Sequence, residues 1–404
     1  MTRDSDNSER SGLNFAPFPK DFLWGAATAA HQVEGNNINS NWWEMEHSGV
    51  QGITEPSGDA VDHYHRFADD IAMLADAGLN SYRFSLEWAR IEPEKGFFSH
   101  ACIDHYRRMI DTCLEQQLEP VITLMHFTVP RWMNAEGFWY NRDAPELFAR
   151  YTDAVLPILS SGVRYVCTIN EPNIAAMLAG SSTTESLPSG ALPEPDLHLA
   201  DQLLAAHKRA REILGSIPHL RSGWTIATQD FTPTDEAGAV EKTAEYAYSR
   251  ETWYLEQATD DDFVGVQAYT RTLIGPNGPY GVSPEVEQTL TGWEYFPRAA
   301  ADGIRTAWEK SAHTPILVTE NGIATDNDDR RISYTEESLS AIHDVIDEGI
   351  DVRGYIHWSA LDNFEWASGF RPTFGLIAVN RETFARTPKP SLFWLGDVAH
   401  RNHL

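Results

Sequence analysis

Two hydrophobic periods alternate along the chain. Short apolar runs rich in β-branched and aromatic side chains are followed by longer stretches in which apolar residues recur every three or four positions. The first pattern predicts buried strands and the second predicts amphipathic helices. We expect strands at residues 22–28, 80–85, 120–125, 163–169, 221–228, 263–269, 315–320 and 352–358. We expect helices at residues 60–77, 100–117, 144–159, 197–214, 237–257, 294–309, 336–348 and 390–398.

The order of these elements indicates the architecture. Strands alternate with helices from residue 22 to residue 398, which is typical of parallel strands joined by helical crossovers. Eight repeats favour a closed barrel over an open sheet, and no glycine-rich dinucleotide turn follows the first strand. We therefore predict an α/β protein with a single-domain (β/α)8 TIM barrel over residues 15–404. Residues 1–14 are expected to form a disordered N-terminal tail.

Composition and charge narrow the class of protein. The 404 residues are 42% hydrophobic, which is ample for one large core. The net charge of −28 argues against nucleic acids and anionic membranes as partners, because like charges repel. Cys102, Cys113 and Cys167 lack metal-ligand spacing and are typical of the reduced thiols of a cytoplasmic enzyme. We expect neither a signal peptide nor a membrane span, because the start of the chain is polar and no apolar run approaches ~20 residues.

Two carboxylates stand at the ends of predicted strands. Glu320 follows the apolar run 315–319 and precedes the turn residues Asn321 and Gly322. Glu171 follows the strand predicted at 163–169 and precedes Pro172. Burying an unpaired charge costs several kcal/mol, so neither residue is there to fill a core. In a barrel the carboxyl ends of the strands carry the chemistry, and the pair therefore indicates a reaction that uses two carboxyl groups.

The other strand-end residues indicate which reaction this is. They include no metal triad, no Ser-His-Asp set and no lysine suited to a Schiff base, so we expect neither a metal nor a cofactor. Amides and carboxylates match sugar hydroxyls, and aromatic faces pack on sugar rings. Glycoside cleavage needs two carboxyls, and a separation of ~5–5.5 Å implies retention of configuration. The strand-end set is Gln32, Arg83, His126, Asn170, Glu171, Tyr269, Glu320 and Trp358.

Several separate stretches resemble glycoside hydrolase family 1, the β-glucosidase family, in the family's order. They are residues 22–35, 82–85, 168–172, 319–322, 358–366 and 374–376, and the resemblance extends over about residues 15–399. The resemblance implies that Glu171 is the acid/base and Glu320 the nucleophile. It implies that Asn170 holds the sugar 2-hydroxyl, and that Arg83 and Tyr269 keep Glu320 in place and ionised. The remaining residues that it assigns to the sugar site are Gln32, His126, Trp358, Glu365, Trp366 and Phe374.

The resemblance also indicates the kind of substrate, and this sequence departs from the family pattern at several positions. Glu171 is a true acid, so O-glycosides are expected, and Glu365 with Trp366 is the pattern for unphosphorylated sugars. Phe127 stands where the family usually has Trp, and Gln267 and Thr228 stand where it usually has Asn. These positions touch the leaving-group side or its support. We therefore expect a more open leaving-group site, and a natural leaving group other than a second glucose.

The sequence thus predicts a retaining exo-β-glycosidase that hydrolyses terminal β-D-glucosyl, β-D-fucosyl or β-D-galactosyl residues from a small-molecule O-glycoside. Its alternatives are a transglycosidase on the same scaffold and a non-hydrolytic sugar-binding relative. A phosphate-dependent glycosidase is disfavoured by Glu365 and by the acidic charge. The oligomeric state is left open.

Overall fold

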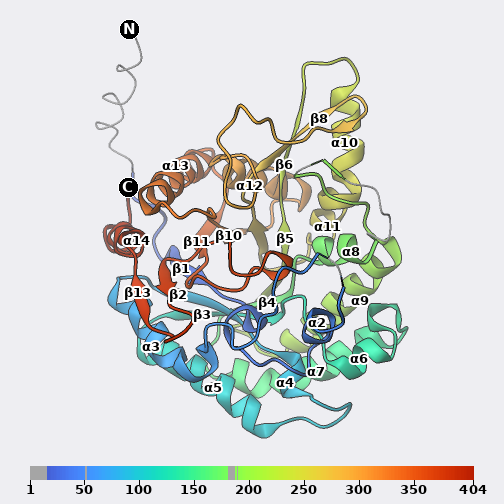
Figure 1. Cartoon of the computed structure of the whole chain (residues 1–404), viewed down its shortest axis with the longest axis vertical. Helices are drawn as coiled ribbons and strands as arrows, with labels where there is room; N and C mark the ends of the chain where they lie inside the picture. Colours follow the sequence, from blue (N-terminus) through green and yellow to red (C-terminus); the bar gives the residue numbers. More distant parts are fainter. Residues whose placement is uncertain (1–15, 51, 181–186, 189) are drawn as a thin grey trace.

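Eight parallel strands form a closed barrel at the centre of the molecule (Figure 1). The computed structural model of the chain describes residues 16–50, 52–180, 187–188 and 190–404, so the expected tail at 1–14 lies outside the described residues. Around the barrel the strand order is β1-β11-β10-β7-β5-β4-β3-β2. This order confirms the predicted (β/α)8 architecture. The strands are β1 Leu23–Ala27, β2 Ser81–Ser85, β3 Glu119–Met125, β4 Tyr165–Asn170, β5 Arg221–Ala227, β7 Val264–Gln267, β10 Ile316–Asn321 and β11 Val352–Trp358.

Helices surround the barrel and cover the outer face of the strands (Figure 1). Several begin at the polar caps that the sequence offers: Ser99 accepts a hydrogen bond from the backbone of Cys102, and Asp196 accepts one from that of Leu199. Such caps satisfy backbone N–H groups that the first helical turn leaves without partners. The main helices are α3 His63–Asp76, α5 His100–Glu115, α7 Ala144–Leu159, α9 Leu197–Leu214, α10 Ala239–Ala247, α11 Trp253–Glu256, α12 Ala299–Lys310, α13 Asp328–Asp347 and α14 Pro390–Arg401.

The helices differ from the sequence prediction most clearly in three places. Helix α12 begins at Ala299 and not at residue 294, because Pro297 disfavours helical geometry in the residue before it. Helix α13 begins eight residues before the predicted start at 336, since Asn327 caps it by accepting from two backbone N–H groups. The single helix predicted at 237–257 contains a π-helical turn, Tyr248–Thr252, between α10 and α11.

Short elements that the hydrophobic pattern did not indicate occupy the loops. Most have too few residues to show a clear period, and the nine residues of Pro172–Gly180 are apolar with little periodicity, which is why the sequence prediction missed them. The helical ones are α1 Ala30–Val33, α2 Asn41–Glu46, α4 Trp88–Ile91, α6 Arg131–Ala135, η2 Phe138–Tyr140, α8 Pro172–Gly180 and η4 Trp366–Ser368. The extended ones are β6 Asp230–Pro233, β8 Arg271–Gly275 and β9 Gly278–Pro279 in one small sheet, and β12 Ile377–Val379 with β13 Arg386–Pro388 in another.

Alternation along the strands divides the core in two. Leu317 points into the barrel interior, where it packs with Val121, Cys167 and Ile356, while its neighbour Val318 belongs to the larger core between strands and helices. This follows from the period of two in a strand. The strands are thus buried on both faces, and their near-continuous apolar runs reflect that. Within the described residues, no helix combines the length and the apolar character needed to cross a membrane.

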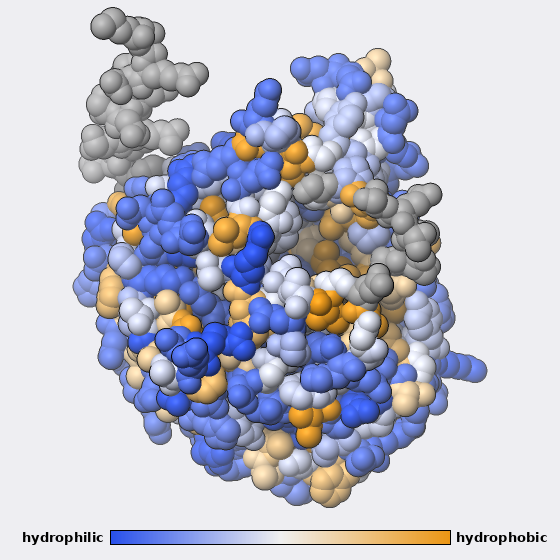
Figure 2. Space-filling view, in the orientation of Figure 1, coloured by the Kyte–Doolittle hydropathy of each residue, from blue (hydrophilic) through white to orange (hydrophobic). Residues whose placement is uncertain are grey.

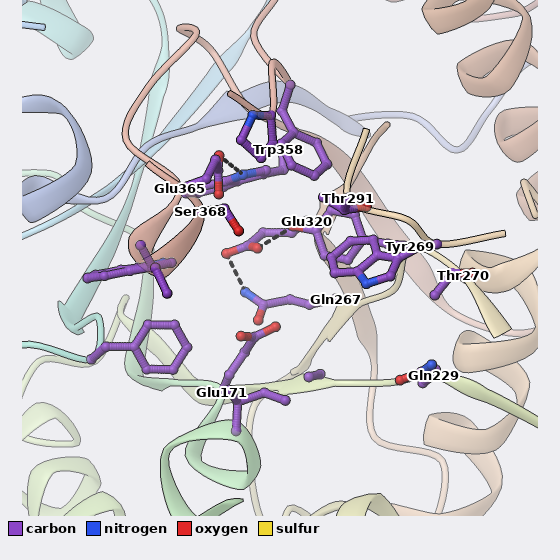
Figure 3. Close-up of a pocket in the computed structure, with 18 of the residues that line it drawn as sticks. Glu171, Gln229, Gln267, Tyr269, Thr270, Thr291, Glu320, Trp358, Glu365 and Ser368 are labelled. Carbon is purple, nitrogen blue, oxygen red and sulfur yellow. Dashed lines mark hydrogen bonds between the residues drawn. The ribbon is translucent and has the colours of Figure 1, made fainter. Parts of the chain in front are cut away.

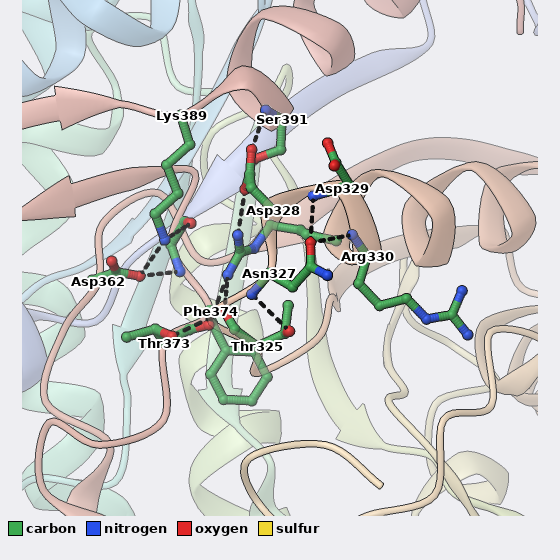
Figure 4. A network of polar contacts seen from close by, with 12 residues as sticks. Thr325, Asn327, Asp328, Asp329, Arg330, Asp362, Thr373, Phe374, Lys389 and Ser391 are labelled. Carbon is green, nitrogen blue, oxygen red and sulfur yellow. Dashed lines mark hydrogen bonds and ion pairs between the residues drawn. The ribbon is translucent and has the colours of Figure 1, made fainter. Parts of the chain in front are cut away.

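A polar network fixes the loop that follows β11 (Figure 4). Asp328, at the start of α13, accepts from the backbone N–H and the hydroxyl of Ser391 in α14, both at 2.8 Å, and pairs with Arg331. Arg331 in turn donates to the carbonyls of Thr325 and Thr373, at 2.6 and 2.9 Å. The guanidinium is almost completely buried, so these contacts replace the water it lost. The network therefore holds the segment that leads into Phe374.

Candidate active site

A cavity of about 450 Å³ opens at the carboxyl ends of the barrel strands. Figure 2 shows this face of the molecule hollowed, with apolar side chains beside the hollow. The cavity brings together residues from the loops that follow most of the barrel strands. Those used below are Gln32, His126, Phe127, Glu171, Ile174, Leu178, Leu192, Gln229, Gln267, Tyr269, Trp293, Glu320, Trp358, Glu365, Trp366 and Phe374.

Glu320 lies near the end of β10 and is 4% exposed. Three side chains donate to its carboxylate. Arg83 Nη1 and Gln267 Nε2 lie 2.5 and 2.8 Å from Oε1, and the Tyr269 hydroxyl lies 2.5 Å from Oε2. Donors of this kind stabilise the ionised form of a carboxyl group. Glu320 is therefore held in one orientation as a carboxylate.

Arg83 links Glu320 to a second strand-end residue, Asn170. Besides its bond to Glu320, the guanidinium donates to Asn170 Oδ1 at 2.5 Å and to the hydroxyl of Thr123 at 3.1 Å. The amide nitrogen of Asn170 lies 3.2 Å from Nε2 of His126. Arg83 is fully buried, and a planar guanidinium with five donors suits such a site better than lysine would. These residues, from β2, β4 and the end of β3, form the floor beneath the carboxyls.

Glu171 follows β4 directly and faces the same cavity. Its backbone N–H donates to the carbonyl of Thr225 on β5 at 2.8 Å, and its φ of 43° lies in the left-handed region. Non-glycine residues adopt that region rarely and often at functional sites. In Figure 3 the carboxyl groups of Glu171 and Glu320 reach into the same space, and the amide of Gln267 lies between them. Among the described residues, no side chain donates to the carboxyl of Glu171 in the way that three donate to Glu320.

The two carboxyls consequently differ in protonation. Burial, followed by the charge of Glu320, raises the pKa of Glu171 well above its ordinary value, and Arg83 opposes this only in part. Burial also raises the pKa of Glu320, but the Arg83 charge and the hydrogen bonds from Tyr269 and Arg83 pull it back. Two nearby carboxyls that share one proton will therefore place it on Glu171. One acid and one carboxylate then face the cavity together.

Polar groups for a sugar lie on one side of the carboxyls. Gln32 Nε2 donates to the backbone oxygen of Phe364 at 2.7 Å and lies 3.3 Å from Glu365 Oε2. Glu365 Oε1 accepts from the indole of Trp358 at 3.1 Å and from Asn363 at 3.0 Å. Burial raises the pKa of Glu365 to about 8. Figure 3 shows Glu365 and Trp358 close together on the side of Glu320 away from Glu171.

Stacked rings form the wall beside this polar group. The His126 imidazole is stacked with Trp358 and with Trp366, at centroid distances of 5.8 and 6.1 Å. Burial and the Arg83 charge lower the pKa of His126 well below its ordinary value, so the ring is neutral. Its Nδ1 is buried and has no hydrogen-bond partner among the described residues. A neutral imidazole with a spare nitrogen can meet a ligand hydroxyl.

Aromatic residues also define the opposite side. Tyr269 packs against Trp293 and Phe374, with ring centroids 5.6 and 5.8 Å apart. Phe374 is 4% exposed and also lines the cavity. Further out the lining becomes apolar, through Phe127, Ile174, Leu178 and Leu192.

The structure brings the residues expected from the sequence to one place, although two of them lie behind the cavity surface. Arg83 and Asn170 contact Glu320 and each other from beneath, while the rest of the expected set lines the cavity. Sequence reasoning assigned Gln267 to the leaving-group side or its support and not to the contact with Glu320, and it missed Trp293. Gln267 ends β7 two residues before Tyr269, so its strand-end position was a usable signal; nothing local marks Trp293. Within the described residues, no group of three or more His, Cys, Asp or Glu side chains is arranged to hold a metal ion.

Comparison with known proteins agrees with this geometry. The chain matches glycosyl hydrolase family 1 over residues 15–278 and 267–404. It is similar to β-glucosidase A of Acetivibrio thermocellus, with 30% identity over 442 aligned positions that cover 95% of this chain and 98% of the relative. Thermostable β-glucosidase B of Thermobispora bispora is 32% identical, with 96% of this chain and 91% of that protein covered.

Solved structures share the barrel. The crystal structure of the β-glycosidase BGL167 superposes with a TM-score of 0.89 at 43% identity, covering 96% of this chain and 98% of that one. The family 1 β-glucosidase of Thermotoga maritima gives a TM-score of 0.89 at 27% identity, with 97% of this chain and 100% of the other covered. On the family match, which spans nearly the whole sequence, and on this shared barrel, the chain belongs to glycosyl hydrolase family 1 and is a glycoside hydrolase.

Proposed function

We propose that the protein is a retaining exo-β-glycosidase that releases terminal β-D-glucosyl residues from O-glycosides, with Glu320 as nucleophile and Glu171 as acid/base. β-D-Fucosides and β-D-galactosides are further candidate substrates. The observation that carries this proposal is the unequal surroundings of two carboxyls in one cavity. Arg83, Gln267 and Tyr269 all serve Glu320, whereas burial beside Glu320 keeps the proton on Glu171.

The first half of the reaction uses this difference directly. Glu320 attacks the anomeric carbon while Glu171 gives its proton to the glycosidic oxygen, and the alcohol leaves. A covalent glycosyl ester on Glu320 results. In this step Asn170, whose oxygen accepts from Arg83, binds the sugar 2-hydroxyl through its amide nitrogen, an interaction that strengthens in the transition state.

The second half follows from the loss of one charge. Once Glu320 is an ester it is neutral, so its contribution to the raised pKa of Glu171 disappears. The pKa of Glu171 then falls, and its carboxylate can take a proton from water. The resulting hydroxide-like oxygen attacks the anomeric carbon from the face the alcohol left, which restores the β-configuration.

The two ends of the cavity suit different parts of a substrate. Gln32, His126, Glu365 and Trp366 offer donors, acceptors and a ring face to a terminal sugar, with Trp358 beneath it. Relatives named β-glucosidases support glucose as that sugar. The apolar lining beyond Glu171 favours an aryl or alkyl leaving group over a second sugar.

The stereochemical outcome is the first test. A panel of nitrophenyl β- and α-glycosides is offered to the enzyme, and proton NMR records the anomer formed first. The β-anomer from a β-glucoside is expected, and rates on the β-fucoside and β-galactoside rank the sugars. An initially formed α-anomer would show inversion and would refute the double displacement.

The nucleophile has its own test. Glu320→Ala is expected to lose turnover, and azide is expected to restore cleavage of a dinitrophenyl β-glucoside with α-glucosyl azide as the product, because azide attacks from the face the carboxylate vacated. Glu309→Ala, an exposed carboxylate on α12, is the matched control and should cleave at the wild-type rate. Absence of rescue, or formation of β-glucosyl azide, would remove Glu320 from the nucleophile role.

Transglycosylation is a second candidate, and the apolar leaving-group side is what favours it. If this wall binds acceptor alcohols, they compete with water for the glycosyl ester. Product analysis with added aryl alcohols separates the two activities, since a transglycosidase gives alkylated or arylated β-glucosides as its main product.

We also place the enzyme in the cytoplasm, because Cys102, Cys113 and Cys167 are unpaired thiols, and cell fractionation tests this placement.

A further inference from the structure

Gln267 stands at the end of a barrel strand where the family usually has Asn. It ends β7, is 1% exposed, and lines the cavity together with Glu171 and Glu320. Its Nε2 lies 2.8 Å from Glu320 Oε1 and also 2.8 Å from Asn170 Oδ1. One amide group therefore contacts the carboxylate and the neighbouring amide at once.

Arg83 fixes which way this amide is turned. A guanidinium has donors only, so the two atoms that receive its hydrogen bonds, Glu320 Oε1 and Asn170 Oδ1, must be acceptors. Gln267 contacts the same two atoms, and turning its own oxygen toward them would set three acceptors against one another. The NH₂ group must therefore face Glu320 and Asn170, and the oxygen must face elsewhere.

The side-chain oxygen of Gln267 takes part in neither of these two contacts. It is buried and has no hydrogen-bond partner among the residues that the structure describes. In Figure 3 the amide lies between the two carboxyls, with its oxygen turned toward Glu171. A protonated carboxyl has an O–H to donate to such an oxygen, whereas an ionised one has none. A buried acceptor without a partner is unfavourable, so the pair is most stable with the proton on Glu171.

We propose that Gln267 is a positioning residue that decides which carboxyl holds the proton: its NH₂ group binds ionised Glu320, and its oxygen accepts the O–H of Glu171. This rests on the proposed function. When a glycoside enters, the O–H of Glu171 is given to the glycosidic oxygen and the proton departs with the alcohol. The Glu171 carboxylate then faces the amide oxygen, and this repulsion favours the return of a proton from water in the second half of the reaction.

Other titratable groups also act on this pair. Arg83 and Tyr269 contact Glu320 directly, and neutral His126 lies on the far side of Asn170. Among the described residues that donate to Glu320, Gln267 is the one whose side chain also turns an acceptor toward Glu171. The charged or titratable groups around the amide are Arg83, His126, Glu171, Tyr269, Glu320 and Glu365.

The pH profile of kcat/KM tests this inference, because its limbs report the free enzyme's acid and base. Gln267→Met removes the donor to Glu320 and the acceptor for Glu171 while keeping similar volume. Loss of the donor raises the pKa of Glu320, and loss of the acceptor lowers that of Glu171. The acidic limb is therefore expected to move to higher pH and the basic limb to lower pH, each by about one unit.

Two further variants sharpen the result. Thr225→Val removes a different donor to Asn170, at 3.2 Å, without touching either carboxyl, and both limbs should stay at their wild-type positions. Gln267→Asn keeps the amide but is one methylene shorter, so its limbs should move in the same directions by less. This variant also carries the test if the Met variant does not fold.

Limbs that stay in place in both Gln267 variants would overturn the inference. A rise in KM for glucosides that is absent for 2-deoxyglucosides, without a shift of either limb, would show instead that the Gln267 oxygen binds a sugar hydroxyl. Rescue of Glu320→Ala by azide is independent of these results. The proposed function can therefore stand while the role of Gln267 fails.

Discussion

Arg83 and Glu320 form a buried ion pair between two strands that are not neighbours in the barrel, with 2.5 Å between Nη1 and Oε1. The residues are 237 positions apart in the chain. Because the guanidinium lowers the pKa of Glu320 against the effect of burial, this pair keeps the carboxylate available at neutral pH.

Replacing Arg83 by Met should raise the pKa of Glu320. An opposite charge at this distance shifts a carboxyl by about 1–3 units, so the acidic limb of kcat/KM is expected to move to higher pH by that amount. Folding should also suffer, by about 3–5 kcal/mol, because Glu320 is left buried without its countercharge. Arg353→Met, which breaks a partly exposed ion pair with Asp351 at the start of β11, is the control and should cost at most about 1 kcal/mol. An unmoved acidic limb would contradict the role given to Arg83.

Glu171→Ala should affect substrates according to their leaving group. Poor leaving groups such as methanol need the proton of Glu171, so kcat/KM on methyl β-glucoside is expected to fall by about 10²–10⁴. Dinitrophenolate leaves without protonation, so kcat/KM on its glucoside should change little. The basic limb of the pH profile should disappear together with the acid. Equal losses on both substrates would show that Glu171 acts in some way other than proton transfer.

Trp293→Ala should weaken binding of aromatic leaving groups. Trp293 packs against Tyr269 and Phe374 and lines the cavity, so an aryl group bound there can contact its indole. An aromatic pair is worth about 0.5–1.5 kcal/mol beyond its buried area, which predicts a rise in KM of about 2–12-fold on nitrophenyl glucosides. Steady-state kinetics on cellobiose should show a smaller change, and Trp293→Phe should recover most of the loss. A larger effect on cellobiose would assign Trp293 to the second sugar instead.

Glu251→Gln should stabilise the protein at alkaline pH. Glu251 is buried in the π-helical turn behind Gln229, whose backbone N–H it accepts at 3.0 Å, and burial raises its pKa to about 8. A carboxyl whose folded pKa is raised stabilises the fold at low pH, and this contribution is lost as the pH rises toward the folded pKa. The Tm difference between Glu251→Gln and wild type should therefore grow from about pH 4.5 to about pH 8 and then level off. Glu256→Gln, at an exposed position in α11, should show no such trend.

The barrel itself was predictable from local patterns. The apolar runs at 120–125 and 352–358 match β3 and β11 within one residue at each end, because strands buried on both faces must be almost wholly apolar. The predicted helix boundaries were wrong where a capping residue, and not the hydrophobic period, sets the start of the helix. The start of α13 at Asp328 depends on the Asn327 cap and on Asp328's contacts with Ser391 in α14, and the latter exist only in the folded chain.

For the site, the sequence by itself determined which residue types stand at the carboxyl ends of the strands. Glu171 and Glu320 each follow an apolar strand, and a parallel barrel must bring such positions to one face. Only the tertiary structure decided which of the two carboxyls is ionised and which one keeps the proton. That Arg83, Gln267 and Tyr269 all bind Glu320 while Glu171 keeps a proton depends on register and side-chain reach between strands far apart in sequence. Local patterns carry no information on such contacts, because they are set by the closure of the barrel.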